Sequence, residues 1–418
     1  MFDLENACKT AKAAARTLVS VPEEKIIAAL VAAADRIEKD AEYIKKENLK
    51  DVEFARGKGY PDPFIDRLLI TDSVLKSMAD GIRKVADLKS PVGETVYSYY
   101  NKEQGVSIDK INVPFGLIGI IYEARPNVTA DAFALCFKTR NAVVLKGGKE
   151  AINSNLAVVK SIKKALMLSG IDENVVSVVE NTDRETTLAF MKMNKYLDLL
   201  IPRGSASLIG SALENATVPI IETGTGNCHI YIDKTADESA AADIVFNAKT
   251  QRYGVCNACE SLVINGGALD ILPAVAERLK EKQVEIRADE RSFAVLKGYP
   301  YLAKATEEDF YTEFLAPIIS VKTVDALDEA IEFINEHSTH HSESIITKDE
   351  KNAEKFLREI DSACVYKNAS TRFSDGFVFG LGAEIGISTQ KLHARGPMGL
   401  DALVTTKYVV NGDGAVRK

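Results

Sequence analysis

Short apolar runs alternate with helical segments from Val113 onward, and this alternation constrains the fold more than any other feature of the chain. The runs of the first series are Leu117–Ile121, Ala142–Leu145, Val175–Val179, Leu197–Ile201 and Val218–Ile221. The runs of the second series are Leu262–Ile264, Ile318–Val321, Ser344–Thr347 and Ala363–Tyr366. Near-continuous apolar strands separated by helices are typical of parallel βαβ construction, in which both faces of a sheet are covered. The pattern predicts two α/β domains.

Two segments lie outside this alternation. Residues from about 5 to 88 carry apolar side chains at three- and four-residue steps, as at Ile26, Leu30 and Ile37, which predicts helices that wrap a sheet. Residues 96–113 are instead rich in Tyr and alternate in character around the turn Asn101–Gly105. That pattern predicts a β-hairpin, whose tyrosines are candidates for a subunit contact.

Length, charge and cysteine content exclude several classes of protein. A chain of 418 residues exceeds what one core usually supports, so two or three domains are expected. The 52 Lys and Arg against 60 Asp and Glu give a net charge of −8, which argues against nucleic acid or an anionic membrane as a partner. No secretion signal or run of transmembrane length is present, and the six scattered cysteines suit reduced thiols. A cytoplasmic location is expected.

The stretch 251–260 contains the candidate nucleophile, Cys256. Gly254 allows a tight turn that brings the thiol and its backbone N–H close to a ligand. Because a free cysteine is more often a small buried apolar residue, this stretch predicts a reactive thiol only together with other motifs. Cys256 and Cys259 form a C-x-x-C, but the chain is far too long for a thioredoxin-like module. A Cys–His hydrolase that uses His229 stays open.

Three turns follow apolar runs, where the carboxyl ends of parallel strands place ligands. The turns at 146–150 and 203–207 combine Gly with Lys, Arg or Ser before a helix, and they can bind an anion or serve only as turns. In the turn at 125–129, Asn127 can donate to a developing oxyanion or be only an Asn in a Pro turn. His337, His340 and His341 have helical spacing, but without an evident third ligand a zinc site is disfavoured.

Four longer stretches resemble those of the γ-glutamyl phosphate reductase family within the aldehyde dehydrogenase superfamily. They are Tyr122–Thr129, Glu222–His229, Asn368–Phe373 and Gly382–Gly399. The resemblance implies an α/β, aldehyde dehydrogenase-like fold of three parts. These are a Rossmann-like NADP-binding domain (1–96 and 113–224), a catalytic α/β domain with the nucleophilic Cys (225–402) and a bridging or oligomerisation element (97–112 and 403–418). Because a hairpin would otherwise expose sheet edges, a homo-oligomer is expected.

The resemblance also implies roles for individual residues. Cys256 matches the nucleophile, and Asn127 with the Cys256 backbone N–H matches the oxyanion hole. The matches to cofactor-binding positions are Lys146 on ribose or phosphate, Gly204 and Ser205 under the pyrophosphate, and Glu313 on the nicotinamide ribose. Arg125, Arg372 and Arg395 are candidates for the substrate's phosphate or α-carboxylate, since a guanidinium binds either at two points.

Two further positions bear on the cofactor and on the reaction. NAD-preferring relatives often carry an acidic residue where this chain has Lys149, and a cation there would attract a 2′-phosphate. The expected cofactor is therefore NADPH/NADP, with no metal. Glu222 occupies the position of the general base in hydrolytic aldehyde dehydrogenases, but the residues after it differ from theirs. We group Glu222 with the cofactor-binding residues and leave its role open.

The implied reaction is the NADPH-dependent reduction of γ-glutamyl phosphate to glutamate 5-semialdehyde and phosphate, a step of proline biosynthesis. It would proceed through a thioacyl intermediate on Cys256. Because the acyl phosphate is unstable, glutamate 5-kinase is a candidate partner. One alternative is a hydrolytic aldehyde dehydrogenase acting on a semialdehyde, which Glu222 keeps open. The other is a non-catalytic binding protein on the same fold, against which the intact Cys256, Asn127 and Lys146 argue.

Overall fold

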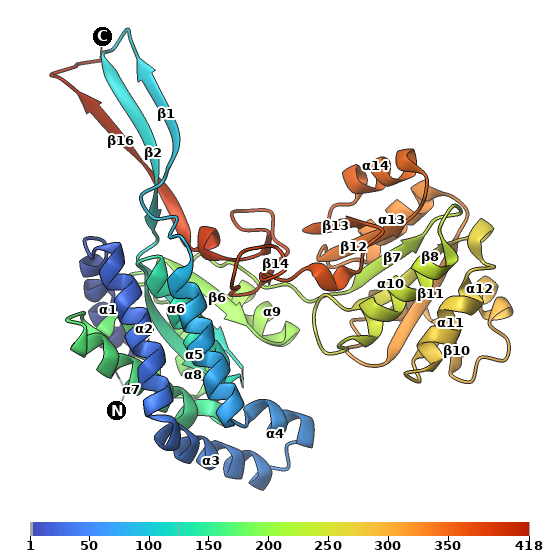
Figure 1. Ribbon diagram of the computed structural model, residues 1–418, viewed down its shortest axis with the longest axis horizontal. Coiled ribbons are helices and arrows are strands. Elements are labelled where there is room, and N and C mark those ends of the chain that lie inside the picture. Colours follow the sequence, from blue (N-terminus) through green and yellow to red (C-terminus); the bar gives the residue numbers. More distant parts are fainter. Residues whose placement is uncertain (1–2, 124, 418) are drawn as a thin grey trace. The chain divides into compact units, whose positions relative to one another are not determined.

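The computed structural model describes residues 3–123 and 125–417, which form two compact units (Figure 1). Unit 1 consists of Met1–Glu222, Gly380–Gly386 and Met398–Lys418, and unit 2 consists of Thr223–Phe379 and Ile387–Pro397. Met1, Phe2, Lys418 and Ala124, which belongs to the motif at 122–129, lie outside the described residues. The chain leaves unit 1 after Glu222, two positions before the boundary predicted from sequence.

Unit 1 is built on a four-stranded parallel sheet with the order β5-β4-β3-β6. Its strands are β3 (Leu117–Tyr122), β4 (Ala142–Gly147), β5 (Val176–Val178) and β6 (Leu199–Arg203). Every residue of β3 and β4 is buried, as their apolar composition predicts. The predicted strand at Val218–Ile221 is wrong, because this segment makes only an isolated bridge between Ile220 and Leu200. Pro219 has no N–H to donate to a ladder.

Helices flank this sheet. They are α1 (Leu4–Leu18), α2 (Glu23–Lys39), α3 (Ala41–Gly57), α4 (Asp62–Leu68), α5 (Asp72–Asp87), α6 (Pro126–Lys138), α7 (Ile152–Leu168), α8 (Arg184–Met191) and α9 (Ala206–Asn215), with the 3-10 turns η1 (Lys149–Ala151), η2 (Glu173–Val175) and η6 (Leu400–Leu403). Helix α2 buries Ile26, Leu30 and Ile37, which confirms the predicted apolar face. Among the described residues, none of the helices is both long enough and apolar enough to cross a membrane.

A three-stranded antiparallel sheet extends from the helical part of unit 1 (Figure 1). It contains β1 (Thr95–Asn101), β2 (Val106–Pro114) and β16 (Val404–Gly412), with β2 in the centre. The pairing of β1 with β2 confirms the predicted hairpin, and β16 joins it from the other end of the chain. The sequence assigned residues 380–386 and 398–402 to the catalytic domain. They lie in unit 1, where Gly382 packs against Leu88.

Unit 2 contains a seven-stranded parallel sheet with the order β10-β9-β11-β8-β7-β12-β13. Its strands are β7 (Cys228–Ile232), β8 (Cys259–Asn265), β9 (Glu285–Ala288), β10 (Leu302–Lys304), β11 (Ile318–Val324), β12 (Ser342–Ile346) and β13 (Cys364–Lys367), and a separate small sheet pairs β14 (Ile387–Ser388) with β15 (Gly396–Pro397). The helices are α10 (Glu238–Thr250), α11 (Leu272–Lys280), α12 (Glu290–Val295), α13 (Leu327–His337) and α14 (Glu350–Glu359), with η3 (Gly266–Ala268), η4 (Glu307–Tyr311) and η5 (Thr371–Phe373). Two apolar cores of unit 2 lie against this sheet. Each unit thus has a parallel sheet together with helices, which confirms the predicted α/β class.

Candidate active site

Cys256 lies in unit 2, in the loop that connects α10 to β8. This thiol is half-buried, whereas the other five cysteines are buried. A nucleophile has to be accessible to a substrate, and among the cysteines Cys256 meets this condition best. A Cβ atom at Gly226 would collide with the Cys256 backbone carbonyl, so only glycine allows the 223–227 segment to approach the nucleophile this closely.

Glu313 contacts the same segment, since its Oε1 accepts a hydrogen bond from the Gly226 N–H at 2.7 Å. Burial raises the pKa of Glu313, and the Gly226 bond opposes that rise. The loop that carries Glu313 is fixed two residues further on. There Leu315 adopts a φ of +51° and donates its N–H to Glu260 at 3.3 Å. Glu260 in turn forms a fully buried ion pair with Lys249.

Arg372 is the predicted substrate arginine that lies near the nucleophile loop. Its Nε donates to the Gln251 side chain at 2.8 Å. Burial lowers the pKa of Arg372, and the charge of the Cys256 thiolate acts against that lowering. Arg372 is thus a cation close enough to the nucleophile to interact with it electrostatically.

The other two candidate arginines lie in different surroundings. Arg395, also in unit 2, donates through Nη2 to the Asp361 carbonyl at 2.9 Å and to its carboxylate at 3.0 Å. Arg125 lies in unit 1 immediately before α6. Asn127 is in the first turn of that helix, and its Nδ2 lies 3.4 Å from the Asp131 carboxylate.

The predicted cofactor lysines lie at the carboxyl end of β4, in unit 1. Lys146 is only 3% exposed, and its Nζ donates to the Gly147 carbonyl at 3.2 Å. Burial lowers the pKa of Lys146, while Asp183 and Glu150 oppose that effect. Lys149 is exposed in the η1 turn, where its ammonium group can meet an anion in solvent.

The turn after β6 already binds a carboxylate, that of Glu123. The Ser205 N–H donates to Glu123 Oε2 at 3.0 Å, and the Ser205 hydroxyl donates to Oε1 at 2.8 Å. A Cβ at Gly204 would lie 2.7 Å from the Glu123 carboxyl carbon. Ser205 also caps the ten-residue helix α9. Helix N-termini bind anions, so the Glu123 carboxylate occupies a position suited to a phosphate.

Glu123 was not among the predicted site residues, although it is in the motif at 122–129. The available signal was strand order, because Tyr122 pairs with Arg203 and the two strand ends are therefore adjacent. Glu222 is the half-buried last residue of the first segment of unit 1. The predicted nucleophile is thus carried by unit 2, whereas Lys146 and Ser205 are carried by unit 1.

Two of the histidines singled out from the sequence, His337 and His341, are hydrogen-bonded within unit 2, whereas neither ring nitrogen of His229 has a hydrogen-bond partner in the part of the chain that the structure describes. His337 donates through Nδ1 to the Phe333 carbonyl at 2.8 Å, and His341 Nδ1 lies 2.8 Å from the Ser342 hydroxyl. His229 is fully buried, with Nδ1 3.3 Å from Glu343. Across the described residues, no group of three or more His, Cys, Asp or Glu side chains could hold a metal ion.

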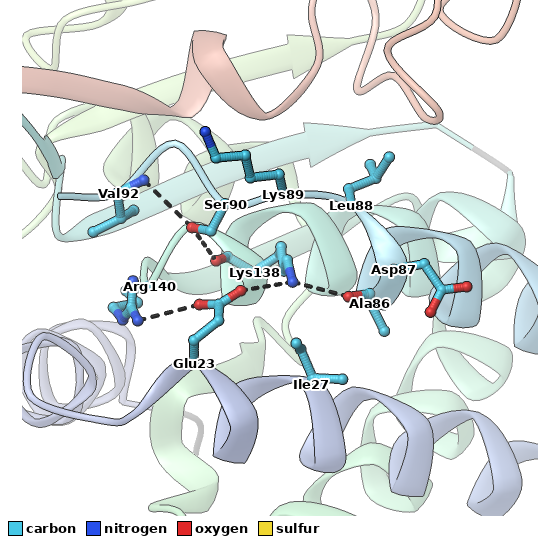
Figure 2. Close-up of a pocket in the computed structure, with 10 residues that line it drawn as sticks. All are labelled: Glu23, Ile27, Ala86, Asp87, Leu88, Lys89, Ser90, Val92, Lys138 and Arg140. Atoms are coloured by element: carbon cyan, nitrogen blue, oxygen red, sulfur yellow. Dashed lines mark hydrogen bonds and ion pairs between the residues drawn. The ribbon is translucent and has the colours of Figure 1, made fainter. Parts of the chain in front are cut away.

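A hollow of about 490 Å³ on unit 1 contains none of the predicted site residues (Figure 2). Glu23 lies between two of the three cations that line it, 2.7 Å from the buried Lys138 Nζ and 3.1 Å from Arg140 Nη2. Lys138 also donates to the Ala86 carbonyl at 2.9 Å. These contacts pair Lys138 and Arg140 with one carboxylate and tie α2 and α5 to the end of α6, which is a structural role.

Comparison with known proteins defines the class. The family model described as "Aldehyde dehydrogenase family" matches residues 2–294 and 302–409, nearly the whole chain. An engineered glycolyl-CoA reductase solved with bound NADP⁺ has the same fold, with a TM-score of 0.69 at 17% identity over 98% of this chain and 97% of that one. The chain belongs to the aldehyde dehydrogenase family.

Two more similar proteins give a narrower grouping. The γ-glutamyl phosphate reductase of Agathobacter rectalis is 51% identical over 419 residues, with 100% of both chains covered. The crystal structure of the γ-glutamyl phosphate reductase of Thermotoga maritima superimposes with a TM-score of 0.96 at 44% identity and covers 99% of each chain. Within the family, the chain therefore groups with the γ-glutamyl phosphate reductases, as its motifs predicted.

Proposed function

We propose that this protein reduces γ-glutamyl phosphate to glutamate 5-semialdehyde and phosphate, as a step of proline biosynthesis in the cytoplasm, and that Cys256 is the nucleophile. The full-length similarity to γ-glutamyl phosphate reductases, at about half identical residues, carries this proposal. The half-buried Cys256 beside Arg372 supplies the chemistry that such a reaction needs.

In the proposed mechanism, the Cys256 thiolate attacks the γ-carbonyl carbon, and phosphate leaves with the electrons of the cleaved C–O bond. The resulting thioester is easier to reduce than a carboxylate. Arg372 stabilises the thiolate before attack, and its guanidinium suits an anionic group of the substrate. Asn127 donates to the oxyanion, a role that rests on the family resemblance. After reduction, the C–S bond breaks, releasing the aldehyde and restoring the thiolate.

The proposed hydride donor is NADPH. Lys146 and Ser205 would hold the cofactor's ribose and phosphates, and Glu313 its nicotinamide ribose. The Glu123 carboxylate supports this assignment, because it already binds the Ser205 N–H and hydroxyl as an anion would. The exposed Lys149 favours the 2′-phosphate of NADPH over the hydroxyl of NADH.

We also propose that the protein is a homo-oligomer assembled through the β1-β2-β16 sheet. Both edge strands carry large exposed apolar side chains, which are unfavourable in water and suit a subunit contact. They are Val96, Tyr97, Tyr99 and Tyr100 on β1, and Tyr408 and Val410 on β16. Direct transfer of the acyl phosphate from glutamate 5-kinase remains a prediction.

The direct test of the nucleophile replaces Cys256 with Ala. We expect the reductase rate to fall about a thousandfold or more, because the covalent step is lost. Cys8→Ala, which removes a buried thiol of unit 1, is the control and should stay within a few-fold of wild type. A Cys256→Ala rate within tenfold of wild type would refute the thioacyl route.

A further inference from the structure

We propose that Cys228 is a positioning residue for the nucleophile and that its S–H group fixes the backbone of Cys256. Cys228 is the first residue of β7 and is fully buried. Its Sγ lies 3.1 Å from the Cys256 carbonyl oxygen, within range of an S–H···O hydrogen bond. Because it is buried, Cys228 acts through Cys256 and does not itself meet the substrate. The inference rests on Cys256 being the nucleophile.

The chemistry of Cys228 makes it a hydrogen-bond donor at this position. Burial raises its pKa well above the usual range, so the side chain stays a thiol with a proton to donate. The same Cys256 carbonyl is confined by Gly226, where a Cβ atom would collide with it. Two residues of the 226–228 segment therefore restrict one peptide group, by exclusion at Gly226 and by attraction at Cys228.

A buried network continues from Cys228 and returns to the nucleophile loop. Cys228 Sγ lies 3.8 Å from His341 Nδ1, which is 2.8 Å from the Ser342 hydroxyl. Ser342 is hydrogen-bonded to the Ser374 hydroxyl. The Ser374 carbonyl accepts from the Asn257 side chain at 2.8 Å. The contacts thus begin at the Cys256 carbonyl and end at the residue that follows it.

This arrangement fixes the peptide between Cys256 and Asn257, and with it the direction of the reactive thiol. Catalysis depends strongly on such alignment, since a displacement of about 1 Å can reduce a rate by about a hundredfold. Loss of the Cys228 donor should therefore lower turnover and thiol reactivity while leaving substrate binding nearly intact.

The test compares Cys228→Ala with Cys228→Ser, which keeps a donor. The rate of NADP⁺ reduction with glutamate 5-semialdehyde and phosphate as substrates gives kcat and KM. Alkylation of Cys256 by iodoacetamide, followed against pH, measures the thiol without substrate or cofactor. For Cys228→Ala we expect a kcat about ten- to a hundredfold lower, a KM within about threefold of wild type, and slower alkylation with its midpoint at higher pH. Cys228→Ser should recover most of both losses.

Cys259→Ala is the matched control. Cys259 pairs with Cys228 across β7 and β8 and is equally buried, but its thiol lies 3.4 Å from the Ser261 carbonyl. If Cys228→Ala keeps the wild-type kcat and alkylation profile within twofold, or if Cys259→Ala produces the same losses, the proposal is wrong.

Should the Ala variant not fold, Cys228→Val and Cys228→Ser, which differ in the donor, must differ in alkylation rate. Equal rates would overturn the proposal. If the wild-type protein is alkylated at Cys256 but does not turn over glutamate 5-semialdehyde, the result counts against the proposed reaction and not against the role of Cys228.

Discussion

At the scale of single residues, the loop that carries Cys256 contacts buried polar side chains, and each of these must keep one charge state. His341 is one of them, and burial lowers its pKa from the usual 6.5 to about 4. His341 is therefore neutral in the folded protein near neutral pH. A neutral imidazole can accept a hydrogen bond through one of its ring nitrogens, which suits the position of Nδ1 beside the Ser342 hydroxyl and leaves the Cys228 S–H to the Cys256 carbonyl.

His341 predicts a definite pH dependence of stability. The unfolded chain binds a proton at this residue more readily than the folded one, so the stability it contributes is complete above about pH 6.5 and is lost as the pH falls toward 4. The loss should reach about 3 kcal/mol. Urea unfolding between pH 7.5 and about 4.5 should therefore show a shallower pH dependence for His341→Gln than for wild type. The exposed His393 provides the control, and His393→Gln should keep the wild-type slope. Identical slopes for all three proteins would contradict this assignment.

Residue types and motifs predicted Cys256, Lys146 and Glu313 as candidates, but not their partners. Glu123 and Ser205 are 82 positions apart, and Cys228 and Cys256 are 28 apart. Spacing along the chain does not determine such contacts, because they depend on which strands become neighbours. Knowledge of the strand order would have found both pairs.

At the scale of elements, apolar runs predicted well the strands of apolar composition and predicted poorly a strand in which apolar and polar residues alternate. Strand β7 was missed because Cys228, His229 and Tyr231 interrupt its apolar residues. All five residues of β7 are nevertheless buried, and Glu343 on the adjacent strand accepts a hydrogen bond from the His229 backbone N–H. A buried polar pair thus allows a strand that a hydrophobic pattern cannot reveal.

The N-terminus of α9 gives a prediction at this scale. The Glu123 carboxylate has to leave Ser205 before a cofactor phosphate can bind there, so it competes with NADPH. In Glu123→Gln the competing charge is removed, and the NADPH dissociation constant should fall about fivefold, as expected for a contribution of about 1 kcal/mol. Titration of NADPH fluorescence against protein measures this constant.

A matched control for this titration is Asp237→Asn, which alters a carboxylate that caps α10 in unit 2. It should leave the dissociation constant unchanged. Weaker NADPH binding by Glu123→Gln would mean that Glu123 assists the cofactor, and the competition would be ruled out.

At the scale of the whole molecule, the three-stranded sheet is the element whose large apolar side chains are left exposed to water in a single chain. Tyr97 and Tyr99 lie on the same side of β1 and are 52% and 50% exposed. We expect the wild-type protein to have a mass in solution at least twice that of the 45.6 kDa chain. The double substitution Tyr97→Glu and Tyr99→Glu should shift this mass toward one chain, as measured by light scattering after size exclusion. Leu168→Glu, at an exposed apolar position on α7, should not. A wild-type mass of one chain at micromolar concentration would exclude the proposed assembly.

The measurement that tests the central claim most directly is the reverse reaction. Glutamate 5-semialdehyde and NADP⁺ are supplied with and without inorganic phosphate, and formation of NADPH is followed. If the Cys256 thioester is resolved by phosphate, as we propose, turnover requires phosphate and is negligible without it. Equal rates in its absence would mean that water resolves the thioester, with Glu222 as the base. The protein would then be a hydrolytic aldehyde dehydrogenase, in contradiction to the proposed function.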